Sequence, residues 1–277
     1  MRSPITVFTF SLLALSALSQ AAEPAKPAPA DNPAIVPLKT ARLIIHEDFE
    51  ATADGGIPTG FTKKGAASVV SDVAHSGTRS LRLDPAIKGM RGLEKTGPEI
   101  AALGGQQWGR MFYRVKLPAP LPEGKGAHTT LVAGAAQSPA EKDPIEVRMA
   151  GLSIGKDGFH YLYNVQPRKG RKEFGQNSRA NQTFTDAWTL IEWYVDHATQ
   201  SYRYFVNGQE LADLSIHKGE GNFAGAEIPA AFESLTFGWC NYQPVADPGF
   251  TVWIDDIAVG KDRIGEQTTV PMAKAKK

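Results

Sequence analysis

Short β-type segments dominate the hydrophobic pattern of this chain. Apolar and aromatic residues recur in short runs between Gly, Pro, Asn and Asp, and no long amphipathic helix is evident. We expect strands at 42–49, 67–71, 80–83, 107–116, 128–133, 146–154, 158–165, 188–196, 201–206, 234–240 and 251–259. This many strands without helices predicts an all-β fold, an antiparallel β-sandwich of the jelly-roll type.

Two turns in this pattern predict hairpins between strands that follow each other. The sequence GKDG at 155–158 separates two strand-like runs, and 196–200 separates IEWYV from SYRYFV. Asn207 and Gly208 then turn the second of these strands toward Glu210 and Leu211. Hairpins of this kind favour an antiparallel sheet.

The two ends of the chain differ in composition from its middle. Residues 1–21 combine Arg2, an apolar core and a small-x-small site at 19–21, which is typical of a secretory signal peptide. We therefore expect an exported protein, secreted or periplasmic, with no membrane contact after cleavage. The predicted organisation is a signal peptide at 1–21, a Pro/Ala-rich linker at 22–38, one jelly-roll domain at 39–265 and a disordered tail at 266–277.

Charge and cysteine content narrow the partners and the means of stabilisation. The formal net charge of the 277 residues is +1, which gives no electrostatic reason to expect nucleic acid. A local basic cluster at 168–172 is read as a solvated loop, with an acidic polymer as its alternative partner. Cys240 is the sole cysteine, so an intrachain disulfide is impossible. We expect a monomer whose core, helped by a metal, holds the fold.

Two adjacent carboxylates interrupt the strand at 251–259 (TVWIDDIAV). Neighbouring side chains on a strand point to opposite faces, so Asp255 or Asp256 must point toward the interior or a sheet edge. A buried charge is costly unless it is paired, hydrogen-bonded or bound to a metal. We expect Asp255 to take the buried position and Asp256 to make a surface or loop contact.

A metal site can be assembled from both ends of the domain. Glu50, the turn at 75–79 with its carbonyls and the Ser76 hydroxyl, and Asp255 together supply hard oxygen ligands of the kind that Ca²⁺ prefers. No His or Cys cluster has the spacing of a transition-metal site. The alternative is that these carboxylates pair with Arg or Lys, or cap backbone amides.

Polar and aromatic residues on the expected sheet faces indicate where a sugar would bind. Alternation places Glu146 and Arg148 on one face of their strand, and an exposed Arg can hold a uronate carboxylate. The next strand has Tyr161 and Tyr163 on one face, with His160 and Asn164 on the other. Further candidates are His128, at the start of the preceding strand, and the group Trp239, Asn241 and Tyr242.

Several motifs in order resemble a known family. They are DFE at 48–50, VAHSGTRSLRL at 73–83, RMFYRVKLP at 110–118, IEVRMAG at 145–151, YFVNG at 204–208, LTFGW at 235–239 and VWIDDIAV at 252–259. Their order resembles the core domain of the cellulose-induced secreted protein family, over about residues 45–265. The resemblance implies a concanavalin A-like jelly roll related to polysaccharide lyases. It also implies a structural Ca²⁺ held by Glu50, Ser76, the carbonyl of Arg79 and Asp255.

The leading functional hypothesis is β-elimination on a uronate-containing polysaccharide. A base must remove the C5 proton while a positive group stabilises the enolate-like carboxylate. Arg148 is the expected neutraliser, and His128, His160 and Tyr163 are the candidate catalytic partners, with substrate contacts from Tyr161, Asn164, Trp239, Asn241 and Tyr242. Glu146 and Leu152 stand where the resembled family tends to have His and Gln, and a carboxylate beside Arg148 would weaken uronate binding.

Three other functions compete with the lyase. A non-catalytic carbohydrate-binding protein would use Trp239, Tyr242 and Arg148 as its platform. A glycoside hydrolase needs two carboxylates across one cleft, for which Glu146 and Glu192 are candidates. The sequence GLSIG at 151–155 matches a serine nucleophile elbow, but a hairpin rather than a helix follows it.

Overall fold

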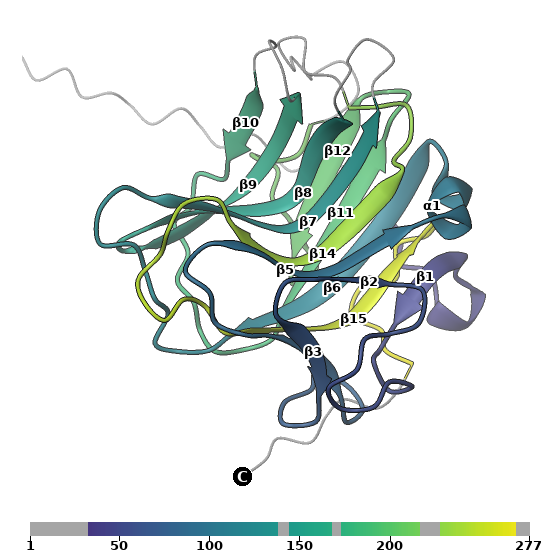
Figure 1. Cartoon of the computed structure of the whole chain (residues 1–277). Coiled ribbons are helices and arrows are strands. Elements are labelled where there is room, and N and C mark those ends of the chain that lie inside the picture. Colours follow the sequence, from purple (N-terminus) through teal and green to yellow (C-terminus); the bar gives the residue numbers. More distant parts are fainter. Residues whose placement is uncertain (1–32, 138–143, 168–172, 217–227, 270–277) are drawn as a thin grey trace, which may run out of the picture.

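The chain folds into two antiparallel β-sheets packed face to face, as Figure 1 shows for the computed structural model. The structure describes residues 33–137, 144–167, 173–216 and 228–269. The predicted signal peptide, most of the predicted linker, the basic cluster at 168–172 and the end of the tail lie outside these residues. The two-sheet architecture confirms the predicted all-β sandwich.

One sheet has eight strands, and its centre is β15. In this sheet β15 pairs with β6 on one side and with both β4 and β1 on the other. The strands follow the order β13 (Gln209–Glu210), β12 (Ser201–Val206), β11 (Thr189–Asp196), β6 (Gln106–Val115), β15 (Val252–Gly260), β4 (Ser80–Leu83) and β3 (Ala67–Val70), with β1 (Leu43–Glu47) beside β15.

The other sheet has seven strands and carries the candidate sugar-binding residues. Its middle strands are consecutive hairpin partners, so that β7, β8 and β9 run side by side. The order is β10 (Phe174–Asn177), β9 (Gly158–Pro167), β8 (Pro144–Gly155), β7 (Ala127–Gln137), β14 (Ser234–Asn241), β5 (Gly89–Thr96) and β2 (Thr62–Lys64).

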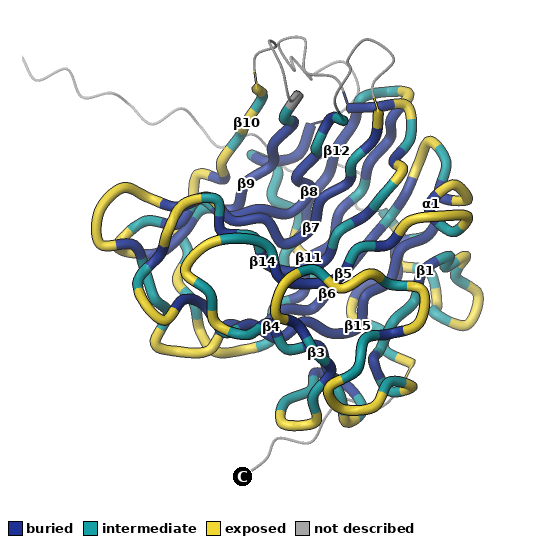
Figure 2. Tube along the Cα trace, viewed as in Figure 1, coloured by how far each residue is buried: buried dark blue, intermediate teal, exposed yellow. Residues whose placement is uncertain are grey.

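The core lies between the two sheets and follows the period-2 alternation of the strands. Val147 and Met149 of β8 are fully buried, and so are Trp193 of β11 and Trp239 of β14. Figure 2 shows the same pattern along the whole trace, with buried strands and exposed connections. Burial of apolar side chains from both inner faces is therefore the main force that holds the sheets together.

The hairpin predictions are confirmed. Strands β8 and β9 meet through the pair of Gly155 and Gly158, and β11 pairs with β12 as far as Asp196 and Ser201. Strand β13 follows the turn at Asn207 and Gly208, as the sequence pattern indicates. A six-residue helix, α1 (Pro98–Leu103), joins β5 to β6 and buries Ile100 and Leu103.

Three strands of the seven-stranded sheet have no matching strand prediction: β2, β5 and β10. Strand β5 reads GMRGLEKT, which combines glycines and charges of low β-propensity. It is held in place by eight register pairs with β14, among which Gly92 lies opposite Gly238. Tertiary pairing therefore overrides local propensity at this strand.

The start and end of the described domain are bonded to each other. The amide of Val36 donates to the carbonyl of Arg263 over 2.8 Å, and the side chain of Gln267 bonds to both Leu38 and Val36. A short 3₁₀ helix, η1 (Leu38–Thr40), follows this contact. Within the described residues, no helix is long and apolar enough to cross a membrane.

Candidate functional site

Arg148 lies near the middle of the outer face of the seven-stranded sheet, held on three sides. Its Nε donates to Oε1 of Glu146 over 2.8 Å, and its Nη2 donates to Oε1 of Gln166. The guanidinium carbon lies 3.8 Å from the centroid of the Tyr242 ring, a close cation–π contact. Arg148 is only 4% exposed, so its position is set before any ligand arrives.

The charges around Arg148 keep it protonated. Burial alone would lower the pKa of this guanidinium, but Tyr242, Glu146 and Glu173 raise it above its ordinary value. Burial, reinforced by the Glu146 carboxylate, raises the pKa of the Tyr242 phenol. Tyr242 donates its hydroxyl proton to Glu146 over 2.7 Å. Arg148, Glu146 and Tyr242 therefore form a cluster in which the Arg148 cation already has one carboxylate, Glu146, beside it.

A hollow of about 190 Å³ lies next to this cluster, and we call it the Arg148 hollow. Its walls come from four strands, and three predicted site residues, His128, Arg148 and Asn164, line it together. In register, His128 of β7 pairs with Ser153 of β8, while Arg148 pairs with Asn164, so the hollow runs along the strands. The full lining is His128, Arg148, Leu162, Asn164, Glu173, Gly175 and Asn177.

Asn164 supplies a planar amide in the wall of the Arg148 hollow. Its Nδ2 donates to Oε1 of Glu173 and to the carbonyl of Phe174, each over 2.7 Å. Its Oδ1 is buried and accepts no hydrogen bond from any described residue. An acceptor left without a donor is costly, so Asn164 retains capacity for a hydroxyl donor at this wall.

Four predicted site residues point into the core instead. Tyr163 and Trp239 are fully buried, Asn241 is 1% exposed and Tyr161 is 4% exposed. The Tyr163 ring stacks on Tyr202, while the Trp239 indole donates to Oδ1 of Asn241. Burial also raises the pKa of the Tyr163 phenol far above its usual range, which does not suit a base. None of the four lines the Arg148 hollow, so their predicted contact with substrate does not occur at that hollow.

His160 shares the outer face with Asn164, as alternation predicted, but it does not line the Arg148 hollow. Its Nδ1 bonds the carbonyl of Ser178 over 2.8 Å, which ties β9 to the segment after β10. Among the candidate bases, only His128 lines the hollow with Arg148. The side chain of His128 is exposed, and its backbone amide is held by Gln243 over 2.7 Å.

The hollow also contains residues that the sequence pattern did not single out. Glu173, Gly175 and Asn177 belong to β10 and the residue before it, a short edge strand whose polar residues read as a loop. Leu162 interrupts the polar outer face of β9 and adds an apolar patch to the wall. The alternation of β9 places Leu162 on the same face as His160 and Asn164, so the sequence pattern could have identified Leu162.

Both carboxylates of the Asp255–Asp256 pair are buried. Strand β15 bulges against β6 after Asp255, and Asp256 adopts a left-handed φ of 49°, which lets both carboxylates turn inward. Oδ2 of Asp256 lies 2.6 Å from Nδ1 of His75, and Oδ1 accepts the Ser76 hydroxyl over 2.9 Å. The contact of Asp256 is thus with a turn, as expected, but it lies in the interior rather than at the surface, because both aspartates are fully buried.

Both ends of the predicted calcium site flank one turn. Asp255 accepts the amides of His75 and Ser76, while Glu50 accepts the amides of Thr78 and Arg79. A Cβ added to Gly77 would lie 2.5 Å from Oε1 of Glu50, so only glycine lets the Glu50 carboxylate approach this closely. Glu50 and Asp255 therefore lie at the same turn, and their role as metal ligands stays a prediction.

The oxygen ligands in and around this turn are of the type that a hard cation prefers. Neither buried aspartate forms an ion pair with Lys or Arg among the described residues, and burial, followed by Asp256, raises the pKa of Asp255. Oδ1 of Asp255 and Oε2 of Glu50 each accept one hydrogen bond and keep a lone pair. No three His, Cys, Asp or Glu side chains of the described residues suffice for a metal, so the hydroxyl of Ser76 and the carbonyl of Arg79 are also needed.

Two alternative catalytic arrangements do not form. Glu192 is 1% exposed on the eight-stranded sheet and binds Arg263 through both oxygens, whereas Glu146 lies on the other sheet. These carboxylates do not face each other across a cleft. The GLSIG sequence lies within β8 and leads into the hairpin to β9, so it does not build a nucleophile elbow.

Comparison with known proteins supports the fold. No family model and no curated protein matches the chain. Among solved structures, the cellulose induced protein Cip1 superposes with a TM-score of 0.54 and 17% identity, over 80% of this chain and 100% of that chain. At this identity the likeness shows the fold alone, a sandwich of the predicted jelly-roll type.

Two further solved structures align over similar lengths. A carbohydrate esterase from the Shiga toxin-encoding bacteriophage phi24B aligns over 79% of this chain and 98% of that chain, with 15% identity and a TM-score of 0.48. Domain 4 of the extracellular arabinanase AbnA from Geobacillus stearothermophilus, in complex with arabinotriose, aligns over 80% and 93%, with 17% identity and a TM-score of 0.45.

Proposed function

We propose that this protein is an exported polysaccharide-binding jelly roll that holds its ligand in the Arg148 hollow. The observation that carries the proposal is that His128, Arg148 and Asn164, from three neighbouring strands, line one hollow on the outer face of a sheet. A guanidinium, an imidazole and an amide are the groups that bind sugar hydroxyls and carboxylates. The export signal at 1–21 supports an encounter with extracellular or periplasmic glycan.

The shape of the hollow favours an extended ligand. His128 of β7 lies opposite Ser153, several residues along β8 from Arg148, and Leu162 adds an apolar surface to the lining. A chain of sugar rings has apolar ring faces and polar edges, so it can satisfy both kinds of wall along this length. A small compact anion would contact only the Arg148 end.

The binding test compares Arg148 variants on a glycan panel. Affinity electrophoresis and calorimetry with neutral and uronate-containing polysaccharides should show retention of the wild type and loss of at least about tenfold in affinity for Arg148→Ala. Arg203→Ala is the matched control, because Arg203 is a buried, Glu210-paired arginine on the other sheet. Equal retention of the wild type and Arg148→Ala on every bound glycan would reject the site.

A second candidate function is β-elimination in the same hollow. It is favoured by one observation, that a permanent cation and an exposed imidazole line the hollow together. His128 would take the C5 proton of a uronate as the bond from C4 to the leaving oxygen breaks and a C4–C5 double bond forms. Arg148 would stabilise the charge that develops on the carboxylate, and the departing oxygen would take a proton from water.

The ultraviolet absorbance of the unsaturated product separates the two functions. A rise with a uronan that is lost in His128→Ala and retained in His160→Ala would establish the lyase. His160 is the control because it lies on the same outer face but outside the hollow. Glycan binding without any rise on a full uronan panel would leave the binding protein as the function.

A further inference from the structure

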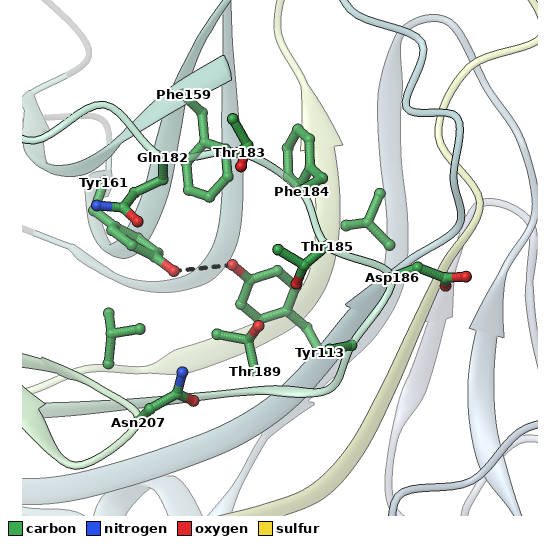
Figure 3. Close-up of a pocket in the computed structure, with 13 residues that line it drawn as sticks. Tyr113, Phe159, Tyr161, Gln182, Thr183, Phe184, Thr185, Asp186, Thr189 and Asn207 are labelled. Carbon is green, nitrogen blue, oxygen red and sulfur yellow. Dashed lines mark hydrogen bonds between the residues drawn. The ribbon is translucent and has the colours of Figure 1, made fainter. Parts of the chain in front are cut away.

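A second hollow lies between the two sheets, on the other face of β9 from the Arg148 hollow (Figure 3). We call it the tyrosine hollow, because Tyr113 of β6 and Tyr161 of β9 meet on its floor. It has a volume of about 140 Å³. Its lining is Tyr113, Val115, Phe159, Tyr161, Gln182, Thr183, Phe184, Thr185, Asp186, Ala187, Thr189, Val206 and Asn207.

The walls of the tyrosine hollow are fixed by contacts to both sheets. Gln182 forms an isolated backbone bridge with Phe159, with hydrogen bonds of 2.7 and 2.8 Å. Asp186 accepts a 2.9 Å hydrogen bond from Nε of Arg114 on β6. The segment at 182–187 is therefore anchored near both ends, and its exposed rim stands over a buried floor.

The floor offers hydrogen bonds to a ligand. The hydroxyls of Tyr113 and Tyr161 lie 3.1 Å apart, and this contact uses one of their two protons. Burial raises the pKa of Tyr161 to about 12 and raises that of Tyr113 well above its ordinary value, so both phenols keep their protons. Thr189 contributes a third hydroxyl beside Tyr113. The group of hydroxyls can therefore donate to a ligand as well as accept from it.

The upper walls combine further neutral polar groups with apolar ones. Figure 3 shows the Gln182 amide, Thr185 and Asn207 around the space, with the rings of Phe159 and Phe184 along one side. Among the described residues no lysine or arginine lines the hollow, and the one carboxylate in this lining, Asp186, is engaged by Arg114. Anions are disfavoured here for lack of a cation.

We propose that the tyrosine hollow binds one neutral sugar ring, a pentose or hexose unit, at a site separate from the Arg148 hollow. Its volume is close to that of the engineered cavity of roughly 150 Å³ that holds one benzene ring, so one six-membered ring fits. A sugar ring has hydroxyls on its edge for the polar groups and apolar C–H faces for Phe159 and Phe184. A phenol of the same size has one hydroxyl and would leave most of the polar lining unpaired.

Saturation-transfer NMR and calorimetry with individual sugars test this proposal on the full mature chain. The probes are glucose, galactose, mannose, xylose and arabinose, with glucuronate and phenol for comparison. We expect at least one neutral sugar to bind more tightly than glucuronate and phenol. Tyr161→Phe should lower that affinity about threefold to tenfold, the effect of one hydrogen bond.

Blocking the mouth of the hollow keeps the test independent of core packing. Ala187 is exposed on the rim, so Ala187→Trp should abolish sugar binding without disturbing the floor. Thr96→Trp, at an exposed position on β5, is the matched control and should bind normally. A sugar signal that Ala187→Trp removes and Thr96→Trp retains is assigned to this site rather than to the Arg148 hollow. The proposal would be overturned if no neutral sugar bound, if phenol bound more tightly than every neutral sugar, or if Ala187→Trp bound sugar as tightly as the wild type.

Discussion

Glu146 holds one edge of the Arg148 guanidinium, with its Oε1 2.8 Å from Nε. The same carboxylate oxygen accepts the Tyr242 hydroxyl, so Glu146 links the cation to its aromatic partner. Arg148 thus already has a carboxylate partner that competes with an acidic sugar. Charge at position 146 is expected to decide between neutral and acidic glycans.

Glu146→Gln should raise the affinity for uronate oligosaccharides. Glutamine can still accept from Nε of Arg148, but it carries no charge, so Arg148 loses the carboxylate partner that competes with an acidic sugar. A hydrogen bond to a charged group is worth about 1.5–3 kcal/mol, so a gain of roughly tenfold or more is expected. Calorimetry with matched neutral and uronate oligosaccharides measures it, with neutral affinity unchanged. Glu210→Gln, which removes the partner of Arg203, is the control. A uniform loss of affinity for both ligand types would contradict this prediction.

Tyr163→Phe should leave glycan binding and any lyase activity unchanged. The hydroxyl of Tyr163 is buried without a hydrogen-bond partner among the described residues, so its removal should stabilise the fold by up to about 1 kcal/mol. Trp239→Ala should instead cost about 3–5 kcal/mol, because it leaves a large cavity in the core. Urea denaturation measures both free energies of unfolding. Loss of activity in a fully folded Tyr163→Phe protein would show that the assignment of this residue to the core is incomplete.

The different outcomes for Arg148 and Tyr163 show what the sequence could predict about the site. Alternation correctly separated Arg148 from Val147 and Met149 on β8, and Asn164 from Tyr161 and Tyr163 on β9, because strand periodicity is a local property. It did not say which face meets solvent, and an aromatic strand face suits a core as well as a sugar platform. Residues of β10 were missed because an edge strand of polar residues has no local signal until it pairs with β9.

Calcium removal should lower the melting temperature of the wild type. A ligand that binds only the folded state stabilises it by mass action, by about 2.7 kcal/mol at a hundredfold excess over Kd. Glu50→Gln keeps an acceptor for the amides of Thr78 and Arg79 but loses the charge, so its melting should not respond to EDTA. Scanning calorimetry measures the shift. An unchanged wild-type curve, together with no calcium by elemental analysis, would reject the metal.

Acidification should destabilise the protein through His197. Burial lowers the pKa of this imidazole, although the carbonyl of Pro229 and the carboxylate of Asp196 act in the opposite direction. In the unfolded chain the pKa is about 6.5, so the unfolded state binds the proton first. Stability is therefore complete above about pH 6.5 and falls as pH drops from there toward the folded-state pKa.

The variant His197→Gln tests this pH dependence. Glutamine keeps an amide donor for the Pro229 carbonyl but does not titrate, so urea midpoints measured from about pH 7.5 to 5.5 should vary less than in the wild type. His46, whose pKa burial also lowers, accounts for part of the remaining slope, and His46→Gln serves as the comparison. If the urea midpoints of the wild type and His197→Gln changed equally with pH, the pH dependence would not come from His197.

Gly238→Ala should destabilise the seven-stranded sheet by about 2 kcal/mol. A Cβ at Gly238 would lie 2.1 Å from the carbonyl oxygen of Arg91 and 2.8 Å from Cα of Gly92 on the paired strand. Gly105→Ala is the matched control, because nothing lies within 4 Å of its added Cβ. Thermal unfolding compares the two variants, and equal melting temperatures would show that the strands can separate to admit a side chain.

The fold was more predictable than the site for a physical reason. Strands with an apolar face, such as β8 and β12, carry their periodicity in the sequence, and their tight turns fix the pairing partner. Strand β5 and the two inward carboxylates of β15 depend on contacts with distant segments, including the Gly92–Gly238 approach and the bulge at Asp256. Such features follow from the assembled sandwich rather than from local preference.

The hydrogen bonds from the amide of Val36 to the carbonyl of Arg263 and from the amide of Leu38 to Oε1 of Gln267 close the domain into a non-covalent ring. A short linker placed there would make the ring covalent, and the chain could be opened instead at the exposed turn of Lys156 and Asp157. Such a circular permutant would keep every strand neighbour and every contact of Arg148. The site therefore depends on which strands lie side by side, and any strand could come first in the chain.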